Sequence, residues 1–210
     1  MSELERNARY TDERIAEHPA QLEVRTHALE EGMRPISPTT GAHLAFIATS
    51  TGARSIIEIG SGVGVASLWL HRGAPNATLT AIDDGPEHLA QARRALLAEG
   101  ARSSTLRLIA GHPLDLLPRM TESGYDLVVI GGELEHIAAY LQHALRLVRP
   151  GGTIVALRAL NGGRVADPAR RDPVTSGLRA LIREFDRQPD LTVSILPVDG
   201  GILQLAKRAS

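Results

Sequence analysis

The chain of 210 residues contains no cysteine, which excludes disulfides, thiolate metal sites and a cysteine nucleophile. Aromatic residues make up only 3% of it, so its core must be mostly aliphatic. The formal net charge is only -1, which gives no broad cationic field for nucleic acid or anionic membranes, although a local basic patch stays compatible with it. No apolar run approaches membrane-spanning length, and the start, MSELERNARYTDER, is polar. We therefore expect a cytoplasmic protein without nucleic-acid or membrane partners.

The length and composition favour one domain spanning residues 1–210, since 43% hydrophobic and 22% charged residues are ordinary for a globular chain and no linker or repeat interrupts it. Residues 3–32 carry widely spaced apolar positions, which predicts short surface helices interrupted near Pro19. In the following RPISPTTG stretch, Pro38 disfavours helix at Ser37, and we expect Thr39 or Thr40 to cap the helix GAHLAFIATS.

Beyond residue 50 the pattern alternates regularly between short aliphatic runs and helical ones. The expected strands are SIIEI, ATLTAI, STLRLI, YDLVVI and GTIVAL, and the expected helices are VASLWLHRG, PEHLAQARRALLAEG, PLDLLPRM and HIAAYLQHALRLV. Strands and helices that alternate in this way predict an α/β fold, with a parallel sheet covered on both faces. We expect RPGG at 149–152 to form the glycine turn that ends the last of these helices.

The C-terminus departs from this alternation. LTVSILPV and GILQLAKR are joined by Asp199-Gly200-Gly201, a combination suited to a tight hairpin with positive backbone φ angles. Two strands joined by a hairpin are antiparallel. The sequence therefore predicts a mostly parallel sheet that finishes with an antiparallel β-hairpin, which an ordinary dinucleotide-binding dehydrogenase sheet does not have.

The segment SIIEIGSGVGVASLWL places three glycines, Gly60, Gly62 and Gly64, between a strand and the next helix. Glycine lets the backbone turn sharply and lets a ligand approach, and the helix start offers unpaired N–H groups. This loop alone is weak evidence for a ligand site, since many strand-to-helix turns are rich in glycine for packing alone. Here Glu58 precedes it, and Asp83 ends the next strand, where an acid can accept both ribose hydroxyls of an adenosine.

Several motifs together resemble class I S-adenosylmethionine-dependent methyltransferases: EIGSGVG, the acidic tip at Asp83, the GH after the third strand and the terminal hairpin. More narrowly, GMRPISPTTG, YDLVVIGGE and GGRVADP resemble the small O-methyltransferases related to catechol and caffeoyl-CoA O-methyltransferases, in particular an actinobacterial-type branch. The resemblance covers nearly the whole chain from about residue 20. It implies a Rossmann-like sandwich with a seven-stranded sheet.

The resemblance also implies a cofactor, S-adenosylmethionine, and the residues around it. Residues 51–210 would form the cofactor-binding core, and residues 1–50 would act as a lid or as a dimer element. The implied cofactor-binding residues are Ser37, Glu58, Gly60, Ser61, Gly62, Gly64, Ser67, Asp83, Asp84, Gly111, His112 and Gly131. One of them departs from the family pattern, because a serine is often found directly after the glycine loop, where this chain has Ala66 followed by Ser67.

Metal-dependent members of that family hold a divalent ion with an Asp at the end of the fourth strand and an Asp-Asn pair at the end of the fifth. This chain has Gly131, Leu157 and Arg158 at those positions, and Leu134 where a basic residue is usual. We therefore expect no metal in the familial position. The fixed charge of Arg158 is instead a candidate for orienting an anionic or phenolic acceptor, although a structural pairing with Glu133 or Asp167 is the alternative.

The remaining catalytic candidates are Glu133 and His136, which follow the fourth strand and are suited to face the sulfonium or to accept a proton. The alternative for these side chains, and the favoured one for Glu135, is the solvated first turn of a helix, where acids are stabilised by the helix dipole. The loop GGRVADPARRDP at 162–173 carries three arginines that form either a lid or ordinary solvated charges.

We thus predict an S-adenosylmethionine-dependent O-methyltransferase that acts on a small-molecule hydroxyl without a divalent metal. The resemblance further implies a homodimer. A protein of the same fold that binds the cofactor without turnover is the main alternative, because all three metal ligands are missing. A nicotinamide-dependent oxidoreductase is compatible with the glycine loop alone, and the terminal hairpin argues against it.

Overall fold

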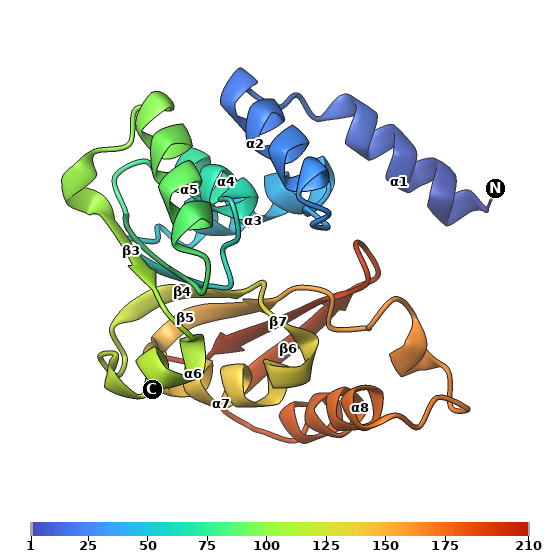
Figure 1. The fold of residues 1–210 in the computed structure, drawn as a ribbon. Coiled ribbons are helices and arrows are strands. Elements are labelled where there is room, and N and C mark those ends of the chain that lie inside the picture. The colour runs from blue at the N-terminus through green and yellow to red at the C-terminus, as the bar shows by residue number, and fades with distance from the viewer. Residues whose placement is uncertain (1, 210) are drawn as a thin grey trace.

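The computed structural model describes residues 2–209, and its centre is one seven-stranded sheet (Figure 1). The strands lie in the order β3-β2-β1-β4-β5-β7-β6. Their bounds are β1 Ser55–Ile59, β2 Thr78–Asp83, β3 Leu106–Ala110, β4 Tyr125–Ile130, β5 Val148–Ala156, β6 Leu191–Leu196 and β7 Ile202–Lys207. Neighbours from β3 to β5 are parallel, whereas β7 is antiparallel to both β5 and β6. The predicted parallel sheet with a terminal hairpin is confirmed.

Consecutive residues of a strand point to opposite faces of the sheet, so each central strand contributes to two cores. In β1, Ile56 belongs to the hydrophobic cluster on one face and Ile57 to the cluster on the other. In β4, Val129 and Val128 divide in the same way. Because both faces are buried, these strands read as continuous aliphatic runs rather than as alternating patterns.

Helices cover both faces of the sheet (Figure 1). One face packs against α2 (Pro19–Glu30), α3 (Pro38–Ser50), α4 (Val65–Gly73) and α5 (Pro86–Ala98), and the other against α6 (Pro113–Leu116), α7 (Ile137–Leu147) and α8 (Pro173–Phe185). Short 3-10 turns occupy Ser103–Thr105, Leu117–Arg119, Leu134–His136 and Arg164–Ala166. Among the described residues, no helix is both long and apolar enough to cross a membrane.

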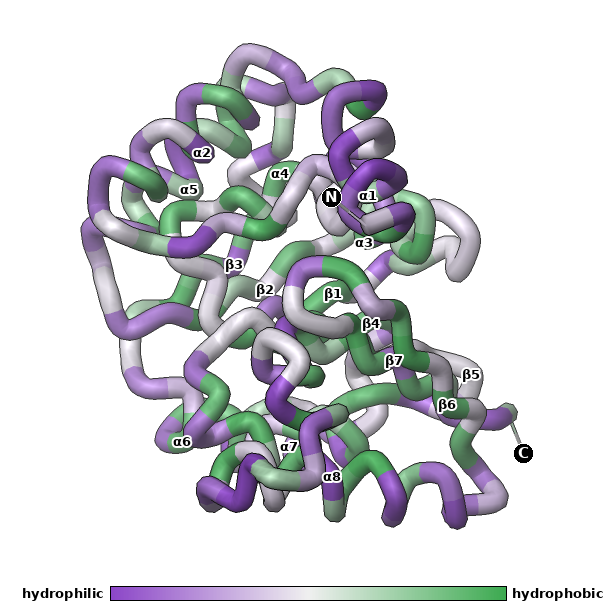
Figure 2. The backbone as a smooth tube through the Cα atoms, turned by 90° about the vertical axis from the view of Figure 1, so that its right-hand side faces the viewer, coloured by the Kyte–Doolittle hydropathy of each residue, from purple (hydrophilic) through white to green (hydrophobic). Residues whose placement is uncertain are grey.

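The N-terminal helices differ in how they pack. Val24 of α2 and Leu44 of α3 are fully buried in the core shared with the sheet. By contrast, α1 (Glu3–Arg14) has no buried residue, and its tube is hydrophilic along most of its length in Figure 2. Residues 19–50 are therefore part of the packed core, and only α1 lies outside it.

Two local expectations were wrong, and a third was confirmed. Neither Thr39 nor Thr40 caps α3, because the helix begins at Pro38 and the Ser37 hydroxyl accepts the Thr40 N–H; proline fits the first helical turn, where its missing N–H costs nothing. RPGG does not form a separate turn, since it lies inside β5 next to a register irregularity. The hairpin loop spans residues 197–201, and φ is positive at Asp199, Gly200 and Gly201 as expected.

Helix α8 was not anticipated, although its sequence carries the signal. Leu178 and Phe185 are buried and Val174, Leu181 and Ile182 pack beside them, which is the spacing of one helix face. Asp172 caps the helix by accepting the Thr175 N–H at 3.0 Å. Pro173 after that cap is the usual start of a helix.

Candidate active site

A cleft of about 650 Å³ opens at the carboxyl ends of the parallel strands. The tips of β1, β2, β4 and β5 form its floor, and residues 33–36, between α2 and α3, form one wall. The strand order changes direction between β1 and β4, because β2 lies on one side of β1 and β4 on the other. In open α/β sheets this switch point is where ligands bind.

The glycine loop after β1 needs its glycines for two different reasons. Gly60 has φ of 74°, and a Cβ there would lie 2.4 Å from the Gly132 Cα, so the loop and the β4 tip touch backbone to backbone. Gly62 has φ of 53°, a Cβ there would meet only the Met33 sulfur, at 3.7 Å, and the residue lines the cleft. Gly64 packs tightly against Ala92 of α5 and does not line the cleft.

Asp83 holds the loops on either side of the β2 tip together. One carboxylate oxygen accepts the Gly62 N–H at 2.7 Å, and the other accepts the Gly85 N–H at 3.0 Å and lies 3.0 Å from His88 Nδ1. Asp83 also lines the cleft. Each carboxylate oxygen has more than one acceptor site, so these contacts leave capacity for ligand hydroxyls. Asp84 lies beside it on the same wall.

Glu58 is a buried acid at the floor of the cleft, with only 1% of its surface exposed. Burial raises the pKa of its carboxyl to about 8, a short hydrogen bond from the Ser67 hydroxyl opposes that rise, and the charge of Asp83 adds to it. Ser67 itself is fully buried and does not line the cleft. The structure thus places Ser67 behind Glu58, where it orients the carboxyl.

Ser61 offers an unpaired polar group to a ligand in this cleft. Its hydroxyl is buried at the cleft and has no hydrogen-bond partner among the described residues. A buried hydroxyl is normally paired, since desolvating it without a partner costs about 1–3 kcal/mol. Helix α4 begins at Val65, shortly after Ser61. Its first turn has no side-chain cap, and Val65 and Ala66 line the cleft. A partial positive charge at this helix start favours a carboxylate.

Arg158 follows β5 at the position where the metal-dependent family members carry an asparagine. Its backbone has φ of 59°, which bulky side chains rarely adopt. One guanidinium nitrogen, Nη2, donates to the Gly131 carbonyl in a short bond and to the Gly132 carbonyl at 3.3 Å. Arg158 forms neither expected ion pair, with Glu133 or with Asp167. Its structural contacts are instead the two hydrogen bonds to the backbone of the β4 tip.

The turn after β4 gathers three rings. The His112 and His136 ring centroids are 5.5 Å apart, and those of His136 and Tyr140 are 6.0 Å apart. His136 Nε2 lies 3.6 Å from a Glu133 carboxylate oxygen, on an exposed side chain. Burial, followed by the charges of Glu133 and Asp84, raises the pKa of Tyr140 to about 12, which keeps its hydroxyl neutral.

The cleft brings together most of the residues expected from the sequence. Those that line it are Glu58, Gly60, Ser61, Gly62, Asp83, Asp84, Gly131, Glu133 and Arg158. Those that do not line it are Ser37, Gly64, Ser67, Gly111, His112 and His136. The Gly111 N–H donates to the Asp83 backbone carbonyl at 2.9 Å, and Pro113, just beyond His112, reaches the cleft instead. Glu135 also lines it, and its side chain is exposed in the short turn before α7.

The residues that line the cleft and that sequence reasoning missed include Met33, Arg34, His88 and Tyr140. Arg34 lies inside the GMRPISPTTG motif, but nothing in the local sequence indicated its role. Tyr140 could have been found from its helical spacing after Ile137, on the buried face of α7. The arginine-rich loop stays outside, because Arg164 pairs with Asp172 at 2.8 Å and does not line the cleft.

Similarity to known proteins decides the family. The sequence model of the O-methyltransferase family matches residues 11–209. The chain belongs to this family of class I S-adenosylmethionine-dependent enzymes. A predicted O-methyltransferase of Mycobacterium sp. (strain JLS) is 35% identical over 199 residues, covering 94% of this chain and 90% of the relative. One from Mycobacterium avium is 36% identical, covering 90% and 86%.

Solved structures give the same result. The O-methyltransferase TomG of Streptomyces achromogenes, involved in tomaymycin synthesis and solved with S-adenosylmethionine, has a TM-score of 0.87 at 26% identity and covers all of both chains. A Corynebacterium glutamicum protein has a TM-score of 0.92 at 27% identity, covering 100% of this chain and 99% of its own. The family and the fold predicted from the motifs are confirmed, and this chain is a methyltransferase.

Among residues 2–209, no group of three or more His, Asp or Glu side chains gathers in a way that could hold a metal ion. Independence from a metal ion stays a prediction from the sequence.

Proposed function

We propose that this methyltransferase binds S-adenosylmethionine in the cleft and transfers its methyl group to a hydroxyl of a small molecule, without a divalent ion in the familial position. One observation carries the proposal: the cleft holds an unpaired buried Ser61 hydroxyl, an acid at the β2 tip, and glycine, leucine and arginine where metal ligands would stand. When bound, the sulfonium supplies an already activated methyl group.

The chain's own residues divide into a donor side and an acceptor side. On the donor side, Asp83 accepts ribose hydroxyls, and Ser61 with the start of α4 receives the carboxylate of the methionine part. Glu58 lies below them and takes its negative charge when a cationic ligand is near. These residues bind and orient the donor, and alignment supplies much of the rate in methyl transfer.

On the acceptor side, Arg158 orients the acceptor oxygen and stabilises its anionic form. Glu133 also lines the cleft, and its carboxylate lies 3.6 Å from His136. It accepts the proton that the acceptor hydroxyl loses. Gly131 leaves the floor of the site open, because it has no side chain at the position of the family's carboxylate.

The decisive experiment is a calorimetric titration with S-adenosylhomocysteine, in Mg²⁺ and in EDTA, followed by a mass-spectrometric screen of acceptors with S-adenosylmethionine. We expect equal affinity and equal turnover with and without the ion. No binding of the cofactor product would overturn the proposal, and turnover that requires Mg²⁺ would overturn its metal-free part.

A cofactor-binding protein without turnover is the second candidate, favoured by the loss of every familial metal ligand at Gly131, Leu157 and Arg158. Tight binding of S-adenosylhomocysteine with no methylated product from any acceptor would establish it. Arg158→Gln separates the two candidates further, because only in an enzyme does it lower turnover while leaving cofactor affinity unchanged.

We also propose that the protein is cytoplasmic, as its composition indicates, and that it forms a homodimer, as the resemblance implies. Exposed apolar side chains support the dimer: Tyr10 on α1 is 66% exposed and Phe46 on the adjoining α3 is 67% exposed. Large apolar groups exposed on neighbouring helices commonly mark an interface.

A further inference from the structure

We infer that the acceptor carries an anionic group, a carboxylate or a phosphate, which Arg34 and Arg158 bind from two different walls of the cleft. This rests on the proposed function, because it names the class of molecule that the methyltransferase accepts. The inference adds Arg34, which belongs to the wall at residues 33–36, to the guanidinium at the β5 tip.

The first observation is that neither guanidinium has a carboxylate partner. Within residues 2–209, the ion pairs of the structure include neither Arg34 nor Arg158. Arg158 is half-buried and donates only to two backbone carbonyls, which carry no net charge. Charged groups that are partly removed from water are normally paired, so Arg158 has capacity for a negatively charged ligand, and Arg34, whose side chain is exposed, lines the same cleft.

The second observation is that the backbone of Arg158 is strained in order to present this side chain. A left-handed φ of 59° costs an arginine on the order of 1 kcal/mol, and such residues cluster at ligand-binding sites. The conformation is fixed from both sides, because the Ala159 N–H donates to the Gly201 carbonyl and the Leu157 N–H to the Ile130 carbonyl. An asparagine or glycine would adopt the same φ without this strain.

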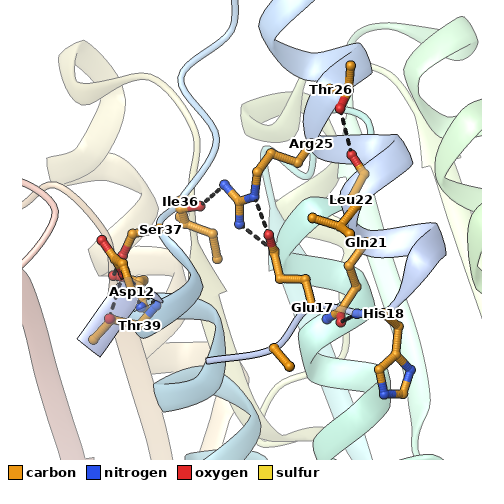
Figure 3. Close-up of polar contacts among 12 residues, drawn as sticks. Asp12, Glu17, His18, Gln21, Leu22, Arg25, Thr26, Ile36, Ser37 and Thr39 are labelled. Atoms are coloured by element: carbon orange, nitrogen blue, oxygen red, sulfur yellow. Dashed lines mark hydrogen bonds and ion pairs between the residues drawn. The ribbon is translucent and has the colours of Figure 1, made fainter. Parts of the chain in front are cut away.

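The third observation is that Arg34 stands on an anchored segment. The Met33 N–H donates to the Ala28 carbonyl at 2.9 Å, and the Arg25 guanidinium donates to the Ile36 carbonyl at 2.5 Å. Figure 3 shows Arg25 held at the same time by a bidentate pair with Glu17, both of them largely buried. The wall is therefore fixed before a ligand arrives, and Arg34 is presented to the cleft without loss of loop entropy.

Charge is also separated across the cleft. The acids Glu58, Asp83 and Asp84 lie at the β1 and β2 tips, which suits a cationic sulfonium and ammonium. The arginines lie at the β5 tip and on the wall above it. Burial and then the neighbouring charge of Arg34 lower the pKa of Arg158, and Asp199 opposes them, so the two guanidinium groups repel each other across one space. An anion between them would relieve that repulsion.

Two of the three other carboxylates near this end already have partners. Asp199 accepts the Ser37 N–H at 2.6 Å, and Glu133 lies 3.6 Å from His136 on an exposed side chain. Glu135 lines the cleft just after the β4 tip, and its side chain is exposed. None of the three forms an ion pair with either arginine.

The test measures the binding of matched probes to protein saturated with S-adenosylhomocysteine. Benzoate is compared with benzamide, and phenyl phosphate with phenol, so that each pair differs mainly in charge and the two pairs separate carboxylate from phosphate. We expect an anionic probe to bind about tenfold more tightly than its neutral counterpart, the usual size of a hydrogen-bonded charge contact. Arg158→Gln and Arg34→Gln should each reduce that preference to about threefold or less.

Two further variants serve as controls. Arg158→Asn keeps the left-handed backbone and removes the charge, so it should fold and lose the preference in the same way. Arg171→Gln removes an exposed arginine that does not line the cleft and should leave the preference unchanged. Equal or undetectable binding of the anionic and neutral probes in both pairs overturns the inference, and so does a preference that survives in both Arg158 variants. Failure of S-adenosylhomocysteine to bind overturns the proposed function as well.

Discussion

The backbone N–H of Ser37 donates a 2.6 Å hydrogen bond to the carboxylate of Asp199, joining positions 162 residues apart in the chain. Ser37 caps α3 at the end of the wall formed by residues 33–36, and Asp199 lies in the β6–β7 hairpin loop. A Cβ on the next residue of that loop, Gly200, would lie 3.7 Å from the Arg158 Cα, so the loop packs against Arg158. The N-terminal wall and the C-terminal hairpin therefore meet at the acceptor end of the cleft.

Replacing Asp199 with glycine should loosen this junction. Glycine tolerates the local φ of 46°, so the change removes the carboxylate without adding backbone strain. We expect a loss of about 1–2 kcal/mol in the free energy of unfolding and faster hydrogen exchange at Ser37, with S-adenosylhomocysteine affinity nearly unchanged. Asp199→Asn keeps an oxygen acceptor and should restore much of the protection. Unchanged exchange at Ser37 in the glycine variant would contradict this role.

Gly60 should tolerate no side chain. A Cβ there would lie 2.4 Å from the Gly132 Cα, and φ is positive as well, so Gly60→Ala must push the glycine loop away from the β4 tip. We expect S-adenosylhomocysteine to bind at least about tenfold more weakly and the midpoint of thermal unfolding to fall, since overpacking costs about 1–3 kcal/mol. Gly52→Ala is the matched control, because φ is also positive there and nothing lies within 4 Å of its Cβ. Its cofactor affinity should equal that of the wild type.

Glu58 should make stability depend on pH. Burial, only partly offset by the bond from Ser67 and reinforced by Asp83, raises its folded pKa from 4.5 to about 8. The folded state therefore keeps a proton that the unfolded state has released, so the free energy of unfolding falls as pH rises from about 4.5 to about 8. Glu58→Gln should lack this component and gain on the order of a few kcal/mol relative to the wild type at about pH 8 compared with about pH 5.

Denaturant titrations of both proteins across this range measure the difference, and parallel curves would show that Glu58 does not titrate there. The same proton should be released when the cofactor product binds, because a cationic amino group lowers the pKa of a nearby acid. Calorimetry at neutral pH in two buffers of different ionisation enthalpy measures that release directly. The Glu58→Gln variant should show none.

The homodimer can be tested on the exposed apolar residues of α1 and α3. Tyr10→Glu combined with Phe46→Glu places two charges in the proposed interface, and we expect the mass measured by light scattering to fall to that of one chain. Leu97→Glu is the control, since Leu97 is 43% exposed on α5, away from these two helices. A wild-type protein that elutes as a monomer would refute the dimer.

The sequence predicted the sheet because its central strands are buried on both faces, so Ile56, Ile57, Val128 and Val129 must all be aliphatic. It predicted the hairpin because the positive φ angles after Pro197 need Asp or Gly. It missed α8, whose start follows a loop dense in arginine and proline, and it placed the α3 cap at Thr39 or Thr40 instead of Ser37.

Most of the donor side was predictable because it depends on local geometry: Gly60 and Gly62 have positive φ, and Asp83 accepts the Gly62 N–H, all within the unit from β1 to β2. On the acceptor side, the sequence identified Arg158 as a candidate, and the tertiary structure decided which other groups lie near it. Arg34, Arg158 and Asp199 lie far apart in the chain, and only the packing of α2 and the hairpin against β5 brings them to one end of the cleft. Whether a charge is paired depends on what folds beside it, and no local pattern records that.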